Sequence, residues 1–307
     1  MNNLLLYSTT VLIWGSTFFA IKFQLGLVAP MLSVAYRFML AAVLLIIYCV
    51  IKKYPMKFTL REHGFMAAQG FCLFAINYVF VYEAEHFLTS GLVAVIFSCI
   101  MIFNILFSTL LLGHKAEIRV IIGAATGLIG ISLVFWQELS QFNLSNGAAA
   151  GLFLGLIGTL FASLGNILSS ENQKNNIPVL QTNAYGMAYG GIMMLILAAV
   201  LGKEFTFSYT IEYISALFYL AVFGSIIAFG AYLTLVGRIG AGKASYATLL
   251  FPLVALLIST WFEGYQWNIN ALVGVGLILS GNLLIITKVN MRDKLLRLFN
   301  IKSLVVD

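Results

Sequence analysis

The sequence predicts an all-α polytopic membrane protein: ten transmembrane helices built as two inverted five-helix repeats, with both termini in the cytoplasm (N-in/C-in). Three observations lead to this fold class. Hydrophobic residues make up 61% of the chain and charged residues only 9%, whereas soluble domains carry about 25% charged residues. The apolar residues form ten long runs joined by short polar loops. Similar features also occur twice, in the same order and at a nearly constant spacing.

Each apolar run is bounded by charged or turn-forming residues and is close to the ~20 residues that a helix needs to cross the hydrocarbon core. The first run has no basic segment before it and no cleavage site after it, so we interpret it as a transmembrane helix rather than a signal peptide. The last run ends before Lys288, where the only long polar segment begins. In chain order, the predicted spans cover residues 4–21, 31–51, 64–82, 87–112, 118–136, 147–169, 180–201, 211–236, 244–262 and 269–287.

Lys and Arg residues indicate the orientation of these helices. Of the 17 Lys and Arg residues, Lys22 and Lys203 fall in loops on one side, Arg37 lies inside a span, and the others fall on the second side. Because basic residues accumulate in cytoplasmic loops, this distribution predicts the N-in/C-in topology. The net charge of +6 is therefore a topology signal, and we expect no nucleic-acid partner.

The chain also contains an internal repeat. Near the start of each half, Pro30 corresponds to Pro178, at an offset of 148 residues, and the later spans match at an offset of 151. The repeat predicts units at 1–139 and 140–288, followed by an amphipathic cytoplasmic tail at 289–307, for which a disordered tail is the alternative. Because five is an odd number, the two units must be inverted, as in many secondary transporters, whose substrate site lies at the midplane between the repeats. The coinciding glycines are Gly91 and Gly242, Gly123 and Gly274, and Gly130 and Gly281.

Several short motifs are similar to those of a known family. Trp14-Gly15-Ser16-Thr17 resembles the opening of the EamA-type permeases of the drug/metabolite transporter superfamily, and the resemblance extends over residues 4–287. It implies a ten-helix inverted-repeat bundle that moves small metabolites, often amino acids, across the bacterial inner membrane, usually outward. Many members carry Pro in both the fourth and ninth helices, whereas here Pro252 has Met101 as its counterpart. The other matching stretches are Tyr36-Arg37-Phe38, residues 90–98, Phe251-Pro252-Leu253, Phe262-Glu263-Gly264, Gly274 and Gly281-Asn282.

Arg37 is a charged residue inside a predicted span, ~9 Å below the outer end of its helix. A charge at the centre of a membrane helix costs ~2.5–3.5 kcal/mol on insertion scales, so it should face a partner or water. We expect Arg37 to pair with Glu83 or Glu85, which follow the third span at the same level, or to face an outer vestibule. Its role is then either structural, or that of a gate or an anchor for a substrate carboxylate.

Polar and aromatic side chains inside the spans form the candidate substrate pocket. Aromatic rings with few fixed charges suit aromatic or amphipathic small molecules. The alternative is that Tyr and Trp occupy interfacial belts and that Ser and Thr bond within their own helices. Pro252 is expected to break the ninth helix near the midplane. The candidate substrate-binding residues are Trp14, Thr17, Arg37, Asn77, Tyr78, Tyr82, Ser98, Asn166, Tyr185, Tyr232 and Tyr246.

The sequence contains no signature of a soluble enzyme, a nucleotide-binding loop or a metal site, so we expect no enzyme activity, cofactor or metal. The leading hypothesis is a secondary transporter of the bacterial inner membrane that exports small metabolites, such as amino acids, by alternating access. The alternative is facilitated diffusion or import of metabolites or amphipathic drugs, while a channel or an intramembrane enzyme is disfavoured. Proton coupling would require a titratable side chain in the transport pathway, and the only candidates near it are Glu83 and Glu85. The expected partners are a small-molecule substrate and the lipid bilayer, and the chain is a monomer or a homodimer through helix five or ten.

Overall fold

The predicted apolar runs are helical in the computed structural model, which describes residues 2–24, 26, 28–142, 147–262 and 265–286. The predicted tail lies outside these described residues. In chain order the helices are α1 (Asn3–Lys22), α2 (Pro30–Ile51), α3 (Leu60–Phe71), η1 (Cys72–Ile76), α4 (Asn77–Glu85), α5 (Ser90–Ser98), α6 (Ile100–Leu112), α7 (Ile118–Val134), α8 (Trp136–Ser140), α9 (Ala148–Lys174), α10 (Val179–Val200), α11 (Ile211–Tyr219), η2 (Leu220–Ile227), α12 (Ala228–Ile239), α13 (Ala241–Ala244), α14 (Ala247–Phe262) and α15 (Ile269–Ile286).

The helices have the length and composition of membrane spans. Within the described chain, eight helices, some of them assembled from consecutive elements, are long and apolar enough to cross a bilayer. The apolar helices α7 and α15 are shorter, with 17 and 18 residues. No strand occurs among the described residues. The fold is therefore that of an all-helical, multi-pass membrane protein.

Local sequence signals set several helix boundaries. Thr59 caps α3, because its hydroxyl accepts from the backbone N–H of Glu62 while the Glu62 carboxylate accepts from the backbone N–H of Thr59 at 2.6 Å. Pro30 occupies the start of α2, where a backbone N–H has no helical partner. Helix α6 ends at Gly113, whose φ of 68° favours glycine.

Two long helices contain π-helical segments. The segment η1 lies between α3 and α4, and η2 lies between α11 and α12. Their first residues, Cys72 and Leu220, are 148 positions apart, which is one of the two offsets of the sequence repeat. Because the helical ladder is displaced there, π segments are frequent at functional sites.

The ninth predicted span is interrupted, but not at Pro252. Helix α14 continues through Pro252, and the interruption lies at Ser245 and Tyr246, between α13 and α14. Proline removes only one backbone hydrogen bond from a helix, and a buried proline in a membrane bundle can be held by its neighbours. Pro252 is buried, so the expected helix break is corrected to Ser245 and Tyr246.

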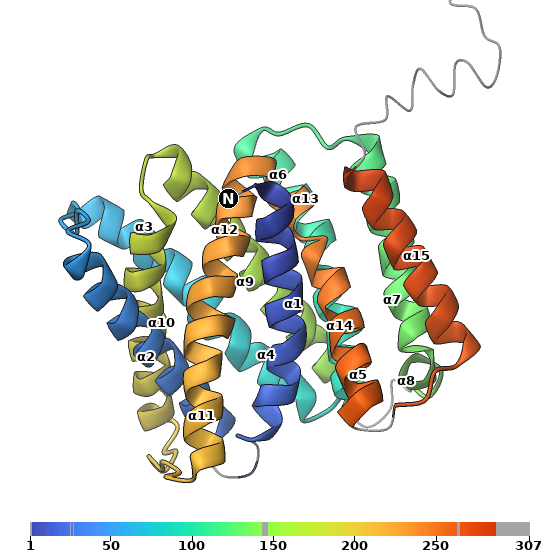
Figure 1. The fold of residues 1–307 in the computed structure, drawn as a ribbon, viewed down its shortest axis with the longest axis horizontal. Helices are drawn as coiled ribbons and strands as arrows, with labels where there is room; N and C mark the ends of the chain where they lie inside the picture. The colour runs from blue at the N-terminus through green and yellow to red at the C-terminus, as the bar shows by residue number, and fades with distance from the viewer. Residues whose placement is uncertain (1, 25, 27, 143–146, 263–264, 287–307) are drawn as a thin grey trace, which may run out of the picture.

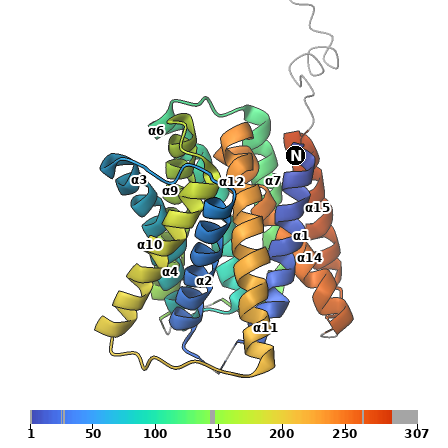
Figure 2. The ribbon, with the colours of Figure 1, turned by 60° about the vertical axis from the view of Figure 1, so that its left-hand side comes forward.

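Helix pairs build the flanks of the bundle. Helix α2 packs along α10 on one side, and α7 packs along α15 on the other (Figure 1). Between these pairs, α9 contacts α3, α4 and α6, while α1 contacts α12 and α14. Figure 2 shows the same arrangement turned by 60°. The helices α1, α9 and α12 therefore form the middle of the bundle.

The helix α1 begins, and α15 ends, at the same end of the bundle (Figure 1), which we call the N-terminal end. The loops that follow α2, α6, α9 and α12 also lie at this end. Most of the described basic residues belong to this end, namely Lys52, Lys53, Lys57, Arg61, Lys115, Arg119, Lys174, Arg238 and Lys243.

Glycines allow α7 and α15 to approach closely. A Cβ atom placed on Gly274 would lie 2.5 Å from the carbonyl oxygen of Gly130, and one on Gly130 would lie 2.7 Å from the carbonyl oxygen of Gly274. The hydroxyl of Tyr246 lies beside Gly281 and donates to the carbonyl of Ile278 at 2.8 Å. The hydrophobic effect does not drive helices together within lipid. Small residues such as these glycines let the two backbones come close enough for extensive van der Waals contact.

Gly274→Ala should destabilise the protein by ~1–3 kcal/mol, because the added methyl group overpacks the contact with α7. Gly276→Ala is a matched control on the same helix, since a Cβ there would meet no atom within 4 Å. Thermal unfolding of the purified variants in detergent measures the effect. Equal melting temperatures for the two variants would contradict the close approach of α7 and α15.

Candidate functional site

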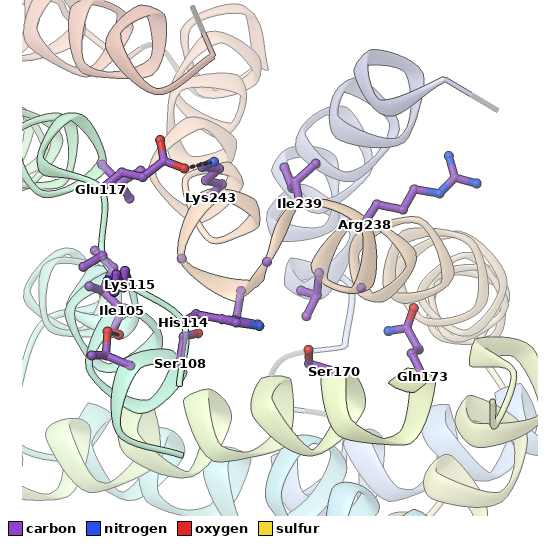
Figure 3. Close-up of a pocket in the computed structure, with 18 of the residues that line it drawn as sticks. Ile105, Ser108, His114, Lys115, Glu117, Ser170, Gln173, Arg238, Ile239 and Lys243 are labelled. Carbon is purple, nitrogen blue, oxygen red and sulfur yellow. Dashed lines mark hydrogen bonds and ion pairs between the residues drawn. The ribbon is translucent and has the colours of Figure 1, made fainter. Parts of the chain in front are cut away.

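A cavity of about 650 Å³ opens at the N-terminal end of the bundle. It lies between α6, α9, α12 and α13, beside the loop that joins α6 to α7 (Figure 3). His114 and Lys115 of that loop are exposed at its rim, whereas Ser108 and Ser170 are buried. The cavity therefore leads from the surface toward the middle of the bundle.

One helical turn beyond these serines lies a set of buried polar side chains that we call the polar layer. Within it, Ser163 Oγ donates to Asn104 Oδ1 at 2.7 Å, and Asn166 Nδ2 donates to the Tyr232 hydroxyl at 3.1 Å. All four side chains are at most 2% exposed. The polar layer consists of Asn104 from α6, Ser163 and Asn166 from α9, and Tyr232 from α12.

Several buried polar atoms of the polar layer and of the adjoining cavity wall lack a hydrogen-bond partner among the described residues. They are Asn104 Nδ2, Asn166 Oδ1 and Ser108 Oγ. An unpaired buried polar atom costs ~1–3 kcal/mol, and together these atoms offer both donors and an acceptor. The arrangement suits reversible hydrogen bonding to a solute that enters from the cavity.

Aromatic rings border the polar layer. The ring centroid of Trp14 lies 5.0 Å from those of Tyr232 and Phe229, and 6.1 Å from that of Phe251. The Trp14 indole N–H donates to the carbonyl oxygen of Gly224, in η2, at 3.2 Å. Because its only polar group is bonded, Trp14 contributes a rigid apolar surface, which suits an apolar or aromatic part of a solute.

Arg37 lies beyond this aromatic cluster, toward the opposite end of the bundle. Its Nε donates to Ser225 Oγ at 2.8 Å, and its guanidinium carbon lies 5.5 Å from the Phe38 ring centroid. The residue is 6% exposed, and with Gln24 and Tyr82 it lines a pocket of only about 20 Å³. The space around Arg37 is therefore much smaller than the cavity at the N-terminal end.

The expected ion pair of Arg37 with Glu83 or Glu85 is not formed in this conformation. Both glutamates are exposed near the end of α4, whereas Arg37 is buried. The ion pairs among the described residues include neither contact. Arg37 instead reaches the hydroxyl of Ser225 in η2, which is closer to the centre of the bundle.

The structure gathers part of the predicted site. Trp14, Asn166 and Tyr232 meet at the polar layer, and the Thr17 hydroxyl donates to the Trp14 carbonyl at 2.6 Å. The Tyr82 side chain lines the pocket of Arg37. Tyr78 packs against Phe38, with ring centroids 5.3 Å apart.

Other predicted site residues lie elsewhere. The Tyr185 hydroxyl donates to the Met56 carbonyl at 2.8 Å, in the loop between α2 and α3, and Tyr246 serves the contact with α15 described above. The Ser98 hydroxyl donates to the Ala94 carbonyl within its own helix. Asn77 is buried on α4, and its Oδ1 has no partner among the described residues.

Sequence reasoning missed Asn104 and Ser225. A signal for Asn104 existed, because Asn104 and Ser108 repeat the spacing of Asn166 and Ser170, so that two apolar helices carry the same polar pair one turn apart. Ser225 gave no such signal, since its position depends on the π segment. Within the described chain, no group of three His, Cys, Asp or Glu residues could hold a metal ion.

An ion-pair network lies at the mouth of the cavity. The Glu117 carboxylate accepts from Lys243 Nζ of α13 (Figure 3) and from Arg119 Nε, each at 2.5 Å. These two bonds hold the pKa of Glu117 below its ordinary value of 4.5, and the bond from Lys243 has the larger effect. The network connects the start of α7 with α13.

Because the pKa of Glu117 is lowered by folding, its stabilising contribution is complete well above pH 4.5 and is lost as the pH falls below that value. The side chain is 43% exposed, so the contribution is ~0.2–1 kcal/mol. We expect the melting temperature of the wild type to fall more steeply than that of Glu117→Gln when neutral solutions are acidified. Parallel pH profiles for the two proteins would contradict the stabilising role.

Known proteins share both the sequence pattern and the fold. The model of the EamA-like transporter family matches residues 2–136 and 149–287. The inner membrane transporter YedA of Escherichia coli strain K12 is 31% identical over 255 residues, which cover 82% of this chain and 80% of YedA. Protein PagO of Salmonella typhimurium strain LT2 is 23% identical over 272 residues, with 88% of each chain covered.

A crystal structure with 16% sequence identity superposes with a TM-score of 0.76 and covers 91% of this chain and 94% of that chain. At this identity the likeness shows the fold alone. The family assignment rests instead on the match of both halves to the family model and on the 31% identity to YedA. This chain therefore belongs to the EamA-like transporter family.

Proposed function

We propose that the protein is a secondary transporter that moves small organic metabolites across the bacterial inner membrane by alternating access. Membership of a transporter family supports transport across a membrane. The mechanism rests on one observation. The cavity of about 650 Å³ comes within one helical turn of the polar layer, whereas the pocket around Arg37, toward the opposite end of the bundle, measures only about 20 Å³.

Matching contacts in the two halves support two inverted five-helix repeats, at 1–139 and 140–288. The segment η2 contacts α1 and α2, as η1 contacts α9 and α10. The family model also matches two segments of similar length. When inverted repeats exchange their conformations, the open end closes and the closed end opens. This exchange is the step that would carry a solute bound at the polar layer to the other side.

Basic residues support the sidedness that we propose. They are concentrated at the N-terminal end, so this end faces the cytoplasm, and the conformation described here is then open inward. The polar layer contains amides and hydroxyls but no carboxylate, which favours facilitated diffusion or exchange over proton-driven transport. The preference for export and for amino acids rests on the family resemblance alone.

We also propose that one chain forms the complete transport path, because the cavity and the polar layer are built from helices of a single chain. The glycine face of α7, an obvious surface for a homodimer, is occupied by α15 of the same chain. The remaining partners are then the solute and the lipid bilayer.

Counterflow in proteoliposomes tests the proposed function. Vesicles loaded with an unlabelled solute take up the same labelled solute, across a panel of amino acids, organic acids, nucleosides and quaternary amines. A carrier gives saturable counterflow for at least one of these classes. Non-saturable flux would indicate a pore, and the absence of flux for the whole panel would contradict the proposal.

Asn166→Ala should weaken transport at least ~2-fold, because it removes an amide from the polar layer together with the bond to Tyr232. The matched control is Ser280→Ala on α15, where the exposed hydroxyl donates to the Gly276 carbonyl of its own helix. The KM and maximal rate of counterflow measure both variants. Equal losses in the two variants would contradict a role of the polar layer in solute binding.

A further inference from the structure

The mouth of the cavity carries an excess of positive charge. Glu117, the single carboxylate among the described lining residues, is bound by both Lys243 and Arg119. Glu171, which lies outside the lining, pairs with Lys174 at 3.5 Å. A concave surface with an excess of one sign of charge raises the local concentration of counter-ions, so this mouth favours anions. The lining cations are Lys115, Lys174, Arg238 and Lys243.

A continuous chain of contacts leads from the polar layer to Arg37. The Tyr232 ring lies against Trp14, and the Trp14 indole donates to the Gly224 carbonyl. The next residue, Ser225, accepts the bond from Arg37. A Cβ placed on Gly224 would lie 3.0 Å from Nη2 of Arg37. These contacts include no carboxylate, so an ammonium group on a solute meets no opposite charge along them.

Arg37 has unused donors in a buried position. It is 6% exposed, its Nε is bonded to Ser225, and its two terminal nitrogens have no hydrogen-bond acceptor among the described residues. The positive-inside rule accounts for basic residues in cytoplasmic loops but not for a buried cation near the opposite end. A guanidinium can bind a carboxylate through two parallel N–H···O bonds.

A second buried donor faces the same pocket. Gln24 is 7% exposed and lines the pocket with Arg37, Ser33 and Tyr82. Its Nε2 has no hydrogen-bond partner among the described residues. The pocket of about 20 Å³ is too small for a carboxylate in this conformation, so the site would form when the opposite end opens.

We infer that the transported solute is an organic anion, whose carboxylate is bound by Arg37 with Gln24 and whose apolar or aromatic body lies against Trp14. This inference rests on the proposed function, because it specifies the solute of the same path. It distinguishes organic acids from zwitterionic amino acids and from cationic drugs.

Solutes that share a carbon skeleton but differ in charge test the inference. Phenyllactate is the anion, phenylalanine the zwitterion and phenylalaninol the cation, while hydroxyisocaproate, leucine and leucinol repeat the series with an aliphatic body. Thermal shift of the purified full chain measures binding, and counterflow in proteoliposomes measures transport. We expect the anions to bind at least ~10-fold more tightly than their partners. The cations lack the carboxylate that Arg37 would bind, and the zwitterions carry an ammonium group that loses its water without gaining an opposite charge.

Variants of Arg37 assign the preference to this residue. Arg37→Gln should weaken phenyllactate binding ~10-fold or more, and Arg37→Lys should weaken it less, because one charged donor is retained. The control is Arg61→Gln, which removes a cation that lies over the Phe65 ring and outside the cavity lining. This control should bind phenyllactate like the wild type. Equal weakening by Arg61→Gln would overturn the assignment to Arg37.

The wild-type solute series needs no variant to fold, so it tests the inference directly. Preferred exchange of phenylalanine, leucine or the two cations would overturn the anion inference while leaving the protein a carrier. The inference also fails if none of these solutes exchanges but the broader panel shows counterflow of a cation, a zwitterion or an uncharged solute. If the broader panel shows no counterflow at all, the proposed function fails together with it.

Discussion

Polar groups in the middle of this bundle must bond to one another, because the bilayer supplies no water to them. Asn104, Ser163, Asn166 and Tyr232 meet this constraint by joining α6, α9 and α12 across the bundle. The constraint is met only in part, since one amide atom of each asparagine has no partner among the described residues. A fully bonded layer would serve only to hold helices together, whereas a partly bonded one can also be completed by a solute.

The surrounding helices fit this division between support and binding. The flanking pair α7 and α15 is joined through glycines such as Gly130 and Gly274 and offers little space for a solute. The π segment η2 lies between α1 and α2, where a backbone carbonyl and a serine hydroxyl accept from Trp14 and Arg37. A displaced helical ladder thus gives polar contacts to the half-buried Trp14 and to the buried Arg37.

The helices could be predicted from the sequence, because a run of about 20 apolar residues matches the thickness of the bilayer. Charged residues are costly inside the bilayer, so they mark where each run ends. The roles of single residues were harder to predict. Tyr185 and Tyr246 have the composition of pocket residues, yet their hydroxyls bond to the Met56 and Ile278 carbonyls, since a phenol serves helix packing equally well. The position of Arg37 within its transmembrane helix was evident from the sequence. The direction of its side chain was not, because it depends on Ser225 and on a π segment that carries no sequence signature.

Thiol labelling of Ser170→Cys from each side of the membrane tests most directly whether the path opens at one end only. Ser170 is 6% exposed at the inner part of the cavity, and the native Cys49, Cys72 and Cys99 would be replaced by Ser. In vesicles of known orientation, a membrane-impermeant maleimide should react much faster from the cytoplasmic side than from the other. Equal reaction from both sides, or from neither, would contradict the proposed path that opens inward and is closed around Arg37.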